Sequence, residues 1–116
     1  MEMDLQIIVK RCDDIPVIVL KGEVDAYTSA RFREVMLEVV DTHGPKVVIS
    51  MADVDYIDSS GLGALVGGLK RVSERDGKIV IVCDKPQVRK VFEITGLEKV
   101  FPIFESEEAA VADVRG

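Results

Sequence analysis

The sequence lacks the residues from which metal, redox and nucleotide sites are usually built. Its 116 residues include no tryptophan, one histidine and two cysteines. Cys12 and Cys83 lie far apart, with no C-x-x-C pair and no neighbouring histidine, so we expect two reduced structural thiols. A Gly-rich nucleotide loop is absent as well. The sequence therefore predicts no metal and no cofactor.

Long apolar runs and an excess of positive charge are also absent. No apolar stretch approaches the roughly 20 residues of a membrane span, and the acidic start at residues 1–4 is unlike a signal peptide. Acidic residues number 21 against 15 basic ones, which gives a net charge of −6 and a pI near 4.8. This balance disfavours nucleic acid and anionic membranes as partners. We expect a cytoplasmic protein that binds neither.

The composition that remains is typical of one folded domain. Hydrophobic residues make up 47% of the chain and charged residues 31%, as in ordinary globular proteins. The length is sufficient to bury a core without disulfides or metals. No linker, repeat or low-complexity segment divides the chain, so the predicted domain covers residues 1–116.

Apolar periodicity predicts an α/β fold with about five strands and about four helices. The first two strands form an antiparallel hairpin with a turn at residues 11–14. The expected strands are residues 5–10, 15–21, 46–51, 78–83 and 100–104, with a helix after each of the last four. The order β-β-α-β-α-β-α-β-α predicts a mixed, mostly parallel sheet.

Capping residues mark the ends of the predicted helices. Gly44 is followed by proline and ends the first helix. Pro86 has the preferred first position of the third helix, and Gly96 matches the left-handed residue that ends it. Ser106 precedes two glutamates and is a suitable N-cap for the last helix.

Residues 57–63 (IDSSGLG) lie where the third strand gives way to the second helix. Asp58 or Ser59 is the expected N-cap, and the Ser59 hydroxyl then lies at the positive end of the helix dipole, where a phosphate is favoured. Most such clusters in soluble proteins only start a helix. The motif alone does not decide between the two interpretations.

A second acidic loop is expected at the same edge of the sheet. If strands 15–21 and 46–51 are parallel and joined by a right-handed crossover, their carboxyl ends meet. Asp25 then comes close to the Ser59 loop. Open α/β sheets have their functional sites at this edge, so the two loops together favour a function.

Three segments in order resemble the motifs of STAS domains. Residues 22–25 (GEVD) resemble the family's G-E-[LIV]-D signature, residues 56–63 (YIDSSGLG) its D-S-[ST]-G-L-G phosphorylation motif, and residues 92–97 (FEITGL) its F-x-[IM]-[TS]-G-L segment. The resemblance spans nearly the whole chain. It is closest to the single-domain anti-sigma-factor antagonists of bacterial stress and sporulation switches.

The resemblance implies a set of site residues. Ser59 would be the phosphoacceptor. The phosphosite loop and partner-binding surface would comprise Asp25, Asp58, Ser60, Gly61, Leu62 and Gly63. The rim of the partner contact would comprise Tyr27, Thr28 and Thr95.

The resemblance also implies the partners. An unphosphorylated antagonist binds an anti-sigma factor that is itself a serine kinase, and so releases a sigma factor. Phosphorylation breaks this complex, and a PPM-type phosphatase restores it. The chain would then be a substrate and a binder with no catalysis of its own, and a monomer when free.

Other interpretations remain open. A STAS domain can serve as a scaffold or sensor without phosphorylation. A serine hydrolase would need G-x-S-x-G and a histidine near Ser59, whereas His43 is expected at the opposite edge. A phospho-receiver would need paired acids after its first strand, and the pair Asp13 and Asp14 falls in the hairpin turn. Leu62 suits the core or a partner contact equally.

Overall fold

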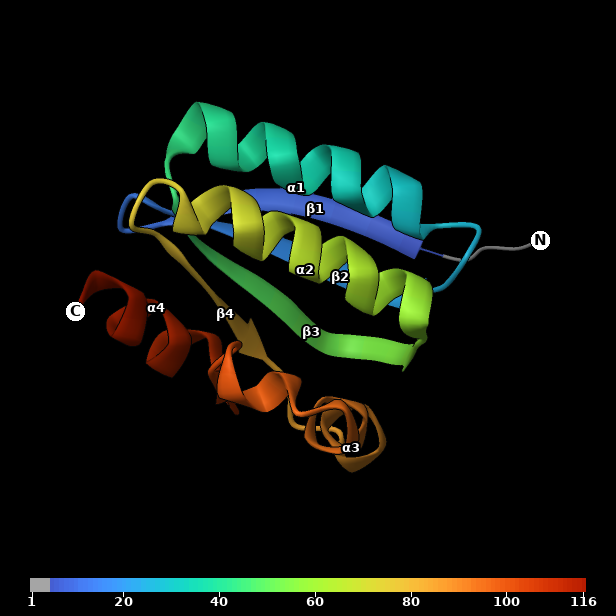
Figure 1. Ribbon diagram of the computed structural model, residues 1–116. Coiled ribbons are helices and arrows are strands. Elements are labelled where there is room, and N and C mark those ends of the chain that lie inside the picture. Colours follow the sequence, from blue (N-terminus) through green and yellow to red (C-terminus); the bar gives the residue numbers. More distant parts are fainter. Residues whose placement is uncertain (1–4) are drawn as a thin grey trace.

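A five-stranded sheet forms the centre of the structure, a computed structural model that describes residues 5–116 (Figure 1). The strand order is β1-β2-β3-β4-β5. The strands are β1 (Leu5–Cys12), β2 (Ile15–Val24), β3 (Lys46–Ile57), β4 (Lys78–Val82) and β5 (Ile103–Phe104). The helices are α1 (Ser29–His43), α2 (Ser59–Ser73), α3 (Pro86–Thr95), α4 (Glu107–Arg115) and the short 3-10 helix η1 (Leu97–Lys99). The predicted α/β class and order of elements are confirmed.

The sheet is mixed, and most of its pairs are parallel. β1 and β2 are antiparallel, while β2–β3, β3–β4 and β4–β5 are parallel. The hairpin turn contains only Asp13 and Asp14, both with positive φ (51° and 72°), as a two-residue type I′ turn requires. The turn is tighter than predicted because β1 continues to Cys12.

Helices cover both faces of the sheet. α1, α2 and α3 pack on one face around a large core that includes Phe32, Leu65 and Phe92. α4 covers the other face, where Val111 and Val114 meet apolar strand residues. Burial on both faces explains why the central strands have continuous apolar runs. No helix within residues 5–116 is both long and apolar enough to span a membrane.

Two strands are longer than predicted, and this lengthening builds the site. β3 reaches Ile57, six residues beyond the expected end, and β2 reaches Val24. Exposed Asp53 and Asp55 interrupt the apolar run of β3, but Val54 remains fully buried. The two strands continue to pair up to Val24 and Ile57, with register shifts on the way.

The C-terminal strands are shorter than predicted. β4 ends at Val82, and only Ile103–Phe104 pairs with it. The predicted start of the last strand is replaced by η1, in which the Val100 N–H donates to the Leu97 carbonyl. This local bond takes Val100 out of the strand ladder.

The predicted helix boundaries are confirmed. Gly44 follows α1 with φ 110°, and Gly96 follows α3 in the left-handed conformation with φ 76°. Pro86 opens α3, and the Ser106 side chain accepts a hydrogen bond from the Ala109 N–H at the start of α4. Each boundary is specified by one local residue and is therefore visible in the sequence.

Candidate functional site

The β2–α1 and β3–α2 loops meet at the carboxyl edge of the sheet, as the parallel topology predicts. The Asp58 N–H donates to the Val24 carbonyl at 3.2 Å. Gly61 lies against the same residue, since a Cβ built on it would lie 2.7 Å from Val24 Cγ1 and 3.0 Å from the Val24 carbonyl oxygen. Gly61 therefore permits the close approach of the two loops.

Asp58 is the residue that starts α2. Its backbone is extended, and its Oδ1 accepts hydrogen bonds from the Ser60 N–H at 2.9 Å and the Gly61 N–H at 3.3 Å. A carboxylate in this position satisfies two of the unpaired donors of the first turn and opposes the helix dipole favourably. The predicted cap is thus Asp58, and Ser59 is not required for it.

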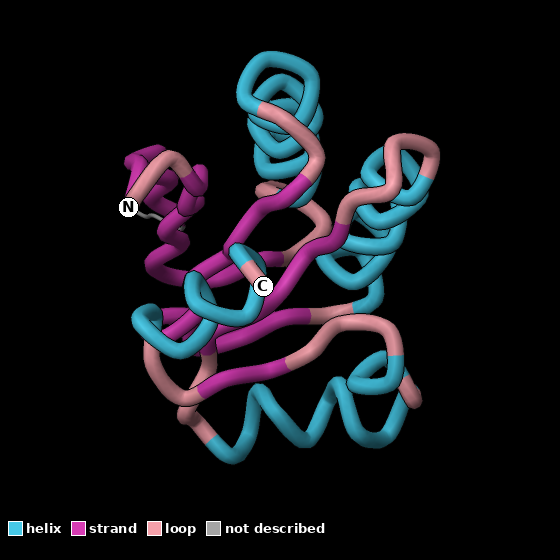
Figure 2. The backbone as a smooth tube through the Cα atoms, turned by 90° about the vertical axis from the view of Figure 1, so that its left-hand side faces the viewer, coloured by secondary structure: helices cyan, strands magenta, loops and turns pink. Residues whose placement is uncertain are grey.

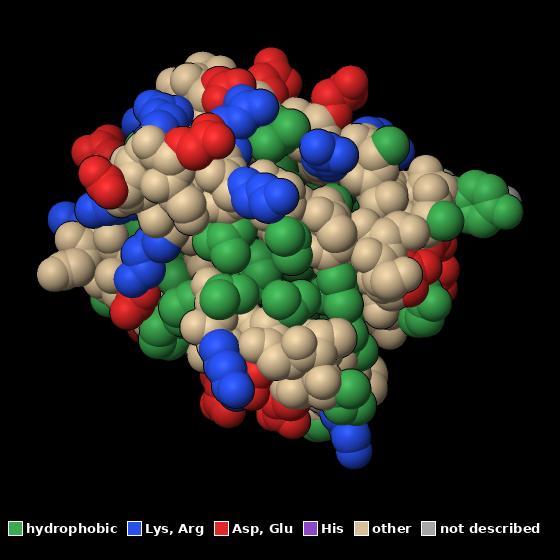
Figure 3. Space-filling model, viewed as in Figure 1, with side chains coloured by type: hydrophobic (Ala, Val, Ile, Leu, Met, Phe, Trp, Pro, Cys, Tyr) green, Lys and Arg blue, Asp and Glu red, His purple; other side chains and the backbone are tan. Residues whose placement is uncertain are grey.

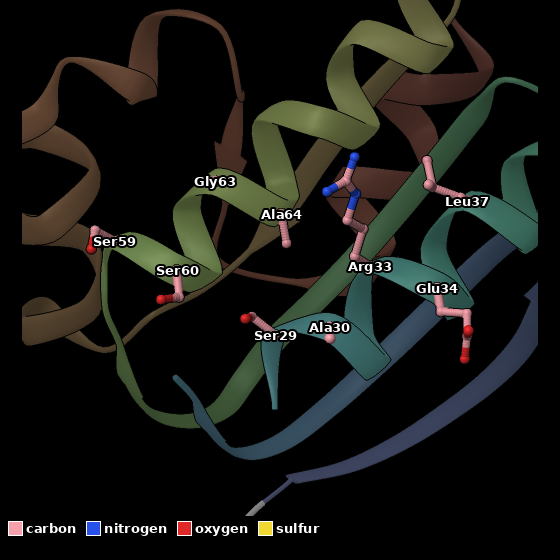
Figure 4. Close-up of a pocket in the computed structure, with 9 residues that line it drawn as sticks. All are labelled: Ser29, Ala30, Arg33, Glu34, Leu37, Ser59, Ser60, Gly63 and Ala64. Carbon is pink, nitrogen blue, oxygen red and sulfur yellow. The ribbon is translucent and has the colours of Figure 1, made fainter. Parts of the chain in front are cut away.

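Ser59 is the first residue of α2, and it is exposed. Its hydroxyl makes no hydrogen bond to any residue in 5–116. Figure 4 shows the Ser59 side chain at the outer end of the first turn, directed away from α1. The geometry therefore presents an accessible primary alcohol at the positive end of a helix.

The Asp25 loop is held by a similar turn. Asp25 Oδ1 accepts from the Tyr27 N–H at 2.9 Å and the Thr28 N–H at 3.1 Å. The Thr28 hydroxyl donates to the Glu23 carbonyl at 2.9 Å and accepts from the Asp25 N–H at 2.9 Å. These bonds fix the loop internally, and Tyr27 is left 94% exposed.

Thr28, which was expected at the rim of the partner contact, is only 3% exposed, and its hydroxyl both donates and accepts a hydrogen bond within the loop. Thr95 ends α3, where its exposed hydroxyl donates to the Val91 carbonyl at 2.8 Å. Leu62 is 8% exposed and belongs to the core. Core packing is thus the structural role of Leu62.

A groove of about 660 Å³ runs between the first halves of α1 and α2, next to Ser59 (Figure 4). Its lining residues are Ser29, Ala30, Arg33, Glu34, Leu37, Ser59, Ser60, Gly63 and Ala64. Arg33 extends from α1 towards α2, while Glu34 points away from α2. Most of the other lining side chains are small, so the groove is open to a partner's side chains.

The groove residues of α1 were not among the predicted site residues. Positions 30, 33, 34 and 37 recur at helical spacing beside the buried stripe of this helix. That spacing is the signal that could have identified them. It becomes informative only when the topology places α1 beside α2.

The face that displays α2 also exposes apolar side chains. Figure 3 shows them gathered in the middle of this face, in the region next to α2. Val66 and Leu69 of α2 and Val91 of α3 pack against the core but are only partly buried. Exposed apolar surface of this kind is typical of protein interaction sites.

Carboxylates dominate the neighbouring part of the sheet edge. Lys85 donates to Asp55 at 2.8 Å, and this hydrogen bond raises the pKa of Lys85. Asp53 and Asp84 act on Lys85 in the same direction. An added phosphate on Ser59 would lie beside the Asp58 carboxylate, which starts the same helix.

Neither the serine-hydrolase interpretation nor the phospho-receiver interpretation finds support in the geometry. His43 is the last residue of α1, about 20 Å along the helix axis from the groove end where Ser29 and Ser60 lie. Asp13 and Asp14 lie in the hairpin turn, at the opposite edge of the sheet from Ser59. Among the described residues, no group of three or more His, Cys, Asp or Glu is placed to hold a metal.

Known proteins share both the sequence and the fold. A model of the STAS domain family matches residues 6–110. An anti-sigma-B factor antagonist of Staphylococcus epidermidis is 32% identical over 106 residues, 91% of this chain and 98% of the relative. An anti-sigma F factor antagonist of Paenibacillus polymyxa is 29% identical over 97% of each chain.

The fold agrees equally well with a solved structure. The crystal structure of an anti-sigma factor antagonist from Mycobacterium paratuberculosis superposes with a TM-score of 0.89 and 26% identity, covering 97% of this chain and 96% of that one. The three motifs, the strand order and these matches lead to the same assignment. This chain belongs to the STAS domain family.

Proposed function

We propose that the chain is an anti-sigma-factor antagonist that is switched by phosphorylation of Ser59. In its unphosphorylated form it binds an anti-sigma factor that is also a serine kinase, and a sigma factor is released. A PPM-type phosphatase reverses the modification, and the chain acts in the cytoplasm as a substrate and binder without catalysis of its own. The observation that carries the proposal is the exposed Ser59 at the first position of α2, whose hydroxyl bonds to none of residues 5–116.

The local geometry favours Ser59 over Ser60 as the phosphoacceptor. Ser59 is exposed, whereas Ser60 is half-buried on the groove and its N–H is bonded to Asp58. A kinase that supplies nucleotide, metal and base needs only a hydroxyl that can enter its active site. Ser59 meets this requirement without any rearrangement of α2.

A phosphate on Ser59 would act mainly on the interface. The Ser60 and Gly61 N–H groups already donate to Asp58, so a phosphate cannot take these donors without displacing the Asp58 carboxylate. The added charge of about −1.5 to −2 therefore remains at the surface. Within a packed contact it adds repulsion and desolvation cost, while the fold is preserved.

The relatives and the surface both support a protein partner. The relatives named anti-sigma factor antagonists indicate the class of partner. The groove beside Ser59 and the apolar side chains near α2 offer a broad area for a protein rather than an enclosed pocket for a small molecule. Asp25 contributes by fixing the loop that exposes Tyr27.

Mass spectrometry of the purified protein tests the proposal. The chain is incubated with ATP-Mg and each candidate anti-sigma kinase of its host, together with the Ser59→Ala and Ser60→Ala variants. We expect one phosphate on the wild type and on Ser60→Ala, and none on Ser59→Ala. Phosphate on Ser60 alone would contradict the assignment of the phosphoacceptor. No phosphate from any kinase would instead favour a scaffold or sensor role.

A further inference from the structure

β1 is the outermost strand of the sheet, and no other described strand pairs with its outer edge. β1 has eight residues and pairs with β2 from Leu5 to Cys12 without a register shift. Figure 2 shows the β1–β2 hairpin at one side of the sheet with no helix outside it. At the opposite edge, β5 has only two residues. An unbroken edge of this length is a template for pairing with another strand.

Apolar side chains are exposed in the middle of this edge. Ile8 is 39% exposed and Val9 is 43% exposed, and as neighbours in a strand they face opposite sides of the sheet. β1 contains no proline and no bulge, two features that commonly prevent edge pairing. A strand added beside β1 would cover part of both side chains at once.

The sequence of β1 is complementary to itself in one antiparallel register. When Ile8 faces Ile8 of a second copy, Ile7 faces Val9 and Lys10 faces Gln6. Arg11 then faces Leu5, the other apolar residues meet one another, and no two like charges are opposed. A parallel pairing in register would set Lys10 and Arg11 against their own copies. A register centred on Val9 would set both cations against isoleucines.

We infer that β1 is a self-association surface, through which a second copy of the chain adds antiparallel and joins two five-stranded sheets into one. The pair is closed by a two-fold axis at Ile8. One strand pair buries little surface, so the association is weak and depends on concentration. This inference departs from the expectation that the free chain is a monomer.

The association is independent of the proposed phosphorylation switch. Ser59 follows β3, which is separated from β1 by β2. The joint therefore does not include β3 or the Ser59 loop of either copy. We expect Ser59→Asp to dimerise as the wild type does, so a failure of this inference and a failure of the proposed function are distinguishable.

Cysteine cross-linking tests the register. Two single substitutions, Ile8→Cys and Val9→Cys, are placed in a Cys12→Ser background, with Cys83 left in the core. Position 8 opposes itself, with Cβ atoms about 4.5–5.5 Å apart, whereas two copies of position 9 lie on a diagonal of roughly 7–8 Å. Under mild oxidation we expect at least tenfold more disulfide dimer from Ile8→Cys. Equal yields from the two variants would overturn the register.

Sedimentation equilibrium tests the association itself. The mass of the wild type should rise above the monomer value of 12.8 kDa as concentration increases. Ile8→Lys should remain monomeric, because two lysines would then face each other at the centre, with an unchanged circular dichroism spectrum as the control for folding. A wild type that stays monomeric up to millimolar concentration would overturn the inference and leave this edge to a strand of another protein.

Discussion

At the residue scale, the two acids of the signature motifs have the same structural task. Asp58 accepts two backbone N–H groups at the start of α2, and Asp25 accepts two in the turn before α1. Both carboxylates therefore hold loops in place through one oxygen. Asp58 therefore affects function indirectly: because Asp58 caps α2, the Ser59 hydroxyl is not needed as the cap.

Two substitutions of Asp58 distinguish the stability that its capping hydrogen bonds contribute from the stability that its negative charge contributes. Asp58→Ala removes both hydrogen bonds, and the free energy of unfolding should fall by about 1 kcal/mol. Asp58→Asn keeps an acceptor oxygen and should stay close to the wild type. Urea unfolding measures both variants. Equal losses in the two would show that the charge of Asp58, rather than its cap, stabilises α2.

The two glycines of residues 57–63 have different roles, which a matched pair of substitutions reveals. A Cβ on Gly61 would lie 2.7 Å from Val24 Cγ1 and 2.8 Å from Ile57 Cγ1, whereas a Cβ on Gly63 meets nothing within 4 Å. Gly61→Ala should cost about 1–3 kcal/mol through overpacking. Gly63→Ala should stabilise the helix by about 0.5–1 kcal/mol.

The stabilised variant also tests the groove. Gly63 is exposed and lines the groove, so the fold does not explain why it lacks a side chain. We expect Gly63→Ala to unfold at higher urea concentration than the wild type yet bind the anti-sigma factor more weakly. A variant that is more stable and binds equally well would remove Gly63 from the interface.

At the scale of elements, helix ends were predictable because single residues specify them. Gly44, Pro86, Gly96 and Ser106 each act through their own backbone or side chain, and each lies where the sequence places it. The strand ends were less predictable. β3 continues past Met51 because its pairing with β2 outweighs the local preference of exposed aspartates.

Part of the candidate site was predictable from the sequence, because single residues and the strand topology specify it. The Asp58 cap and the convergence of the two loops follow from local capping rules and parallel topology. The burial of Thr28 and the contribution of Arg33 depend on side chains that meet only in the folded chain. Periodicity indicates that α1 has a polar face, but not which part of it borders α2.

α4 provides a prediction about what holds a short element in place. This helix has nine residues, too few for stability on its own. Val111 is 4% exposed against the second face of the sheet, so Val111→Ala should cost about 2 kcal/mol. The Arg115–Asp13 ion pair is largely exposed, so Asp13→Asn should cost less than about 1 kcal/mol. Urea unfolding that reversed this order would contradict the account.

At the scale of the whole molecule, the Cys83 thiol makes the free energy of unfolding depend on pH. It is fully buried in the large core, and burial raises the pKa of its thiol. Because the unfolded thiol loses its proton first, the unfolded state binds fewer protons than the folded state above about pH 8.5. Stability is therefore complete below that pH and falls as the pH rises.

Urea titrations between about pH 8.5 and 10 measure this effect, since Lys85, whose pKa is also raised, titrates above that window. One thiol can contribute at most about 1.4 kcal/mol per pH unit. Cys83→Ala is the control and should have a flatter alkaline slope. Identical slopes in the two proteins would show that the Cys83 thiol does not govern the loss.

The molecule as a whole is proposed to switch its interface without changing its fold, and one measurement addresses this claim most directly. Isothermal titration calorimetry compares the affinity of the unphosphorylated and the Ser59-phosphorylated chain for the host's anti-sigma factor, with unfolding midpoints recorded in parallel. We expect at least tenfold weaker binding by the phosphorylated chain, about 1.4 kcal/mol, with unchanged midpoints. Equal affinity of the two forms would contradict the account.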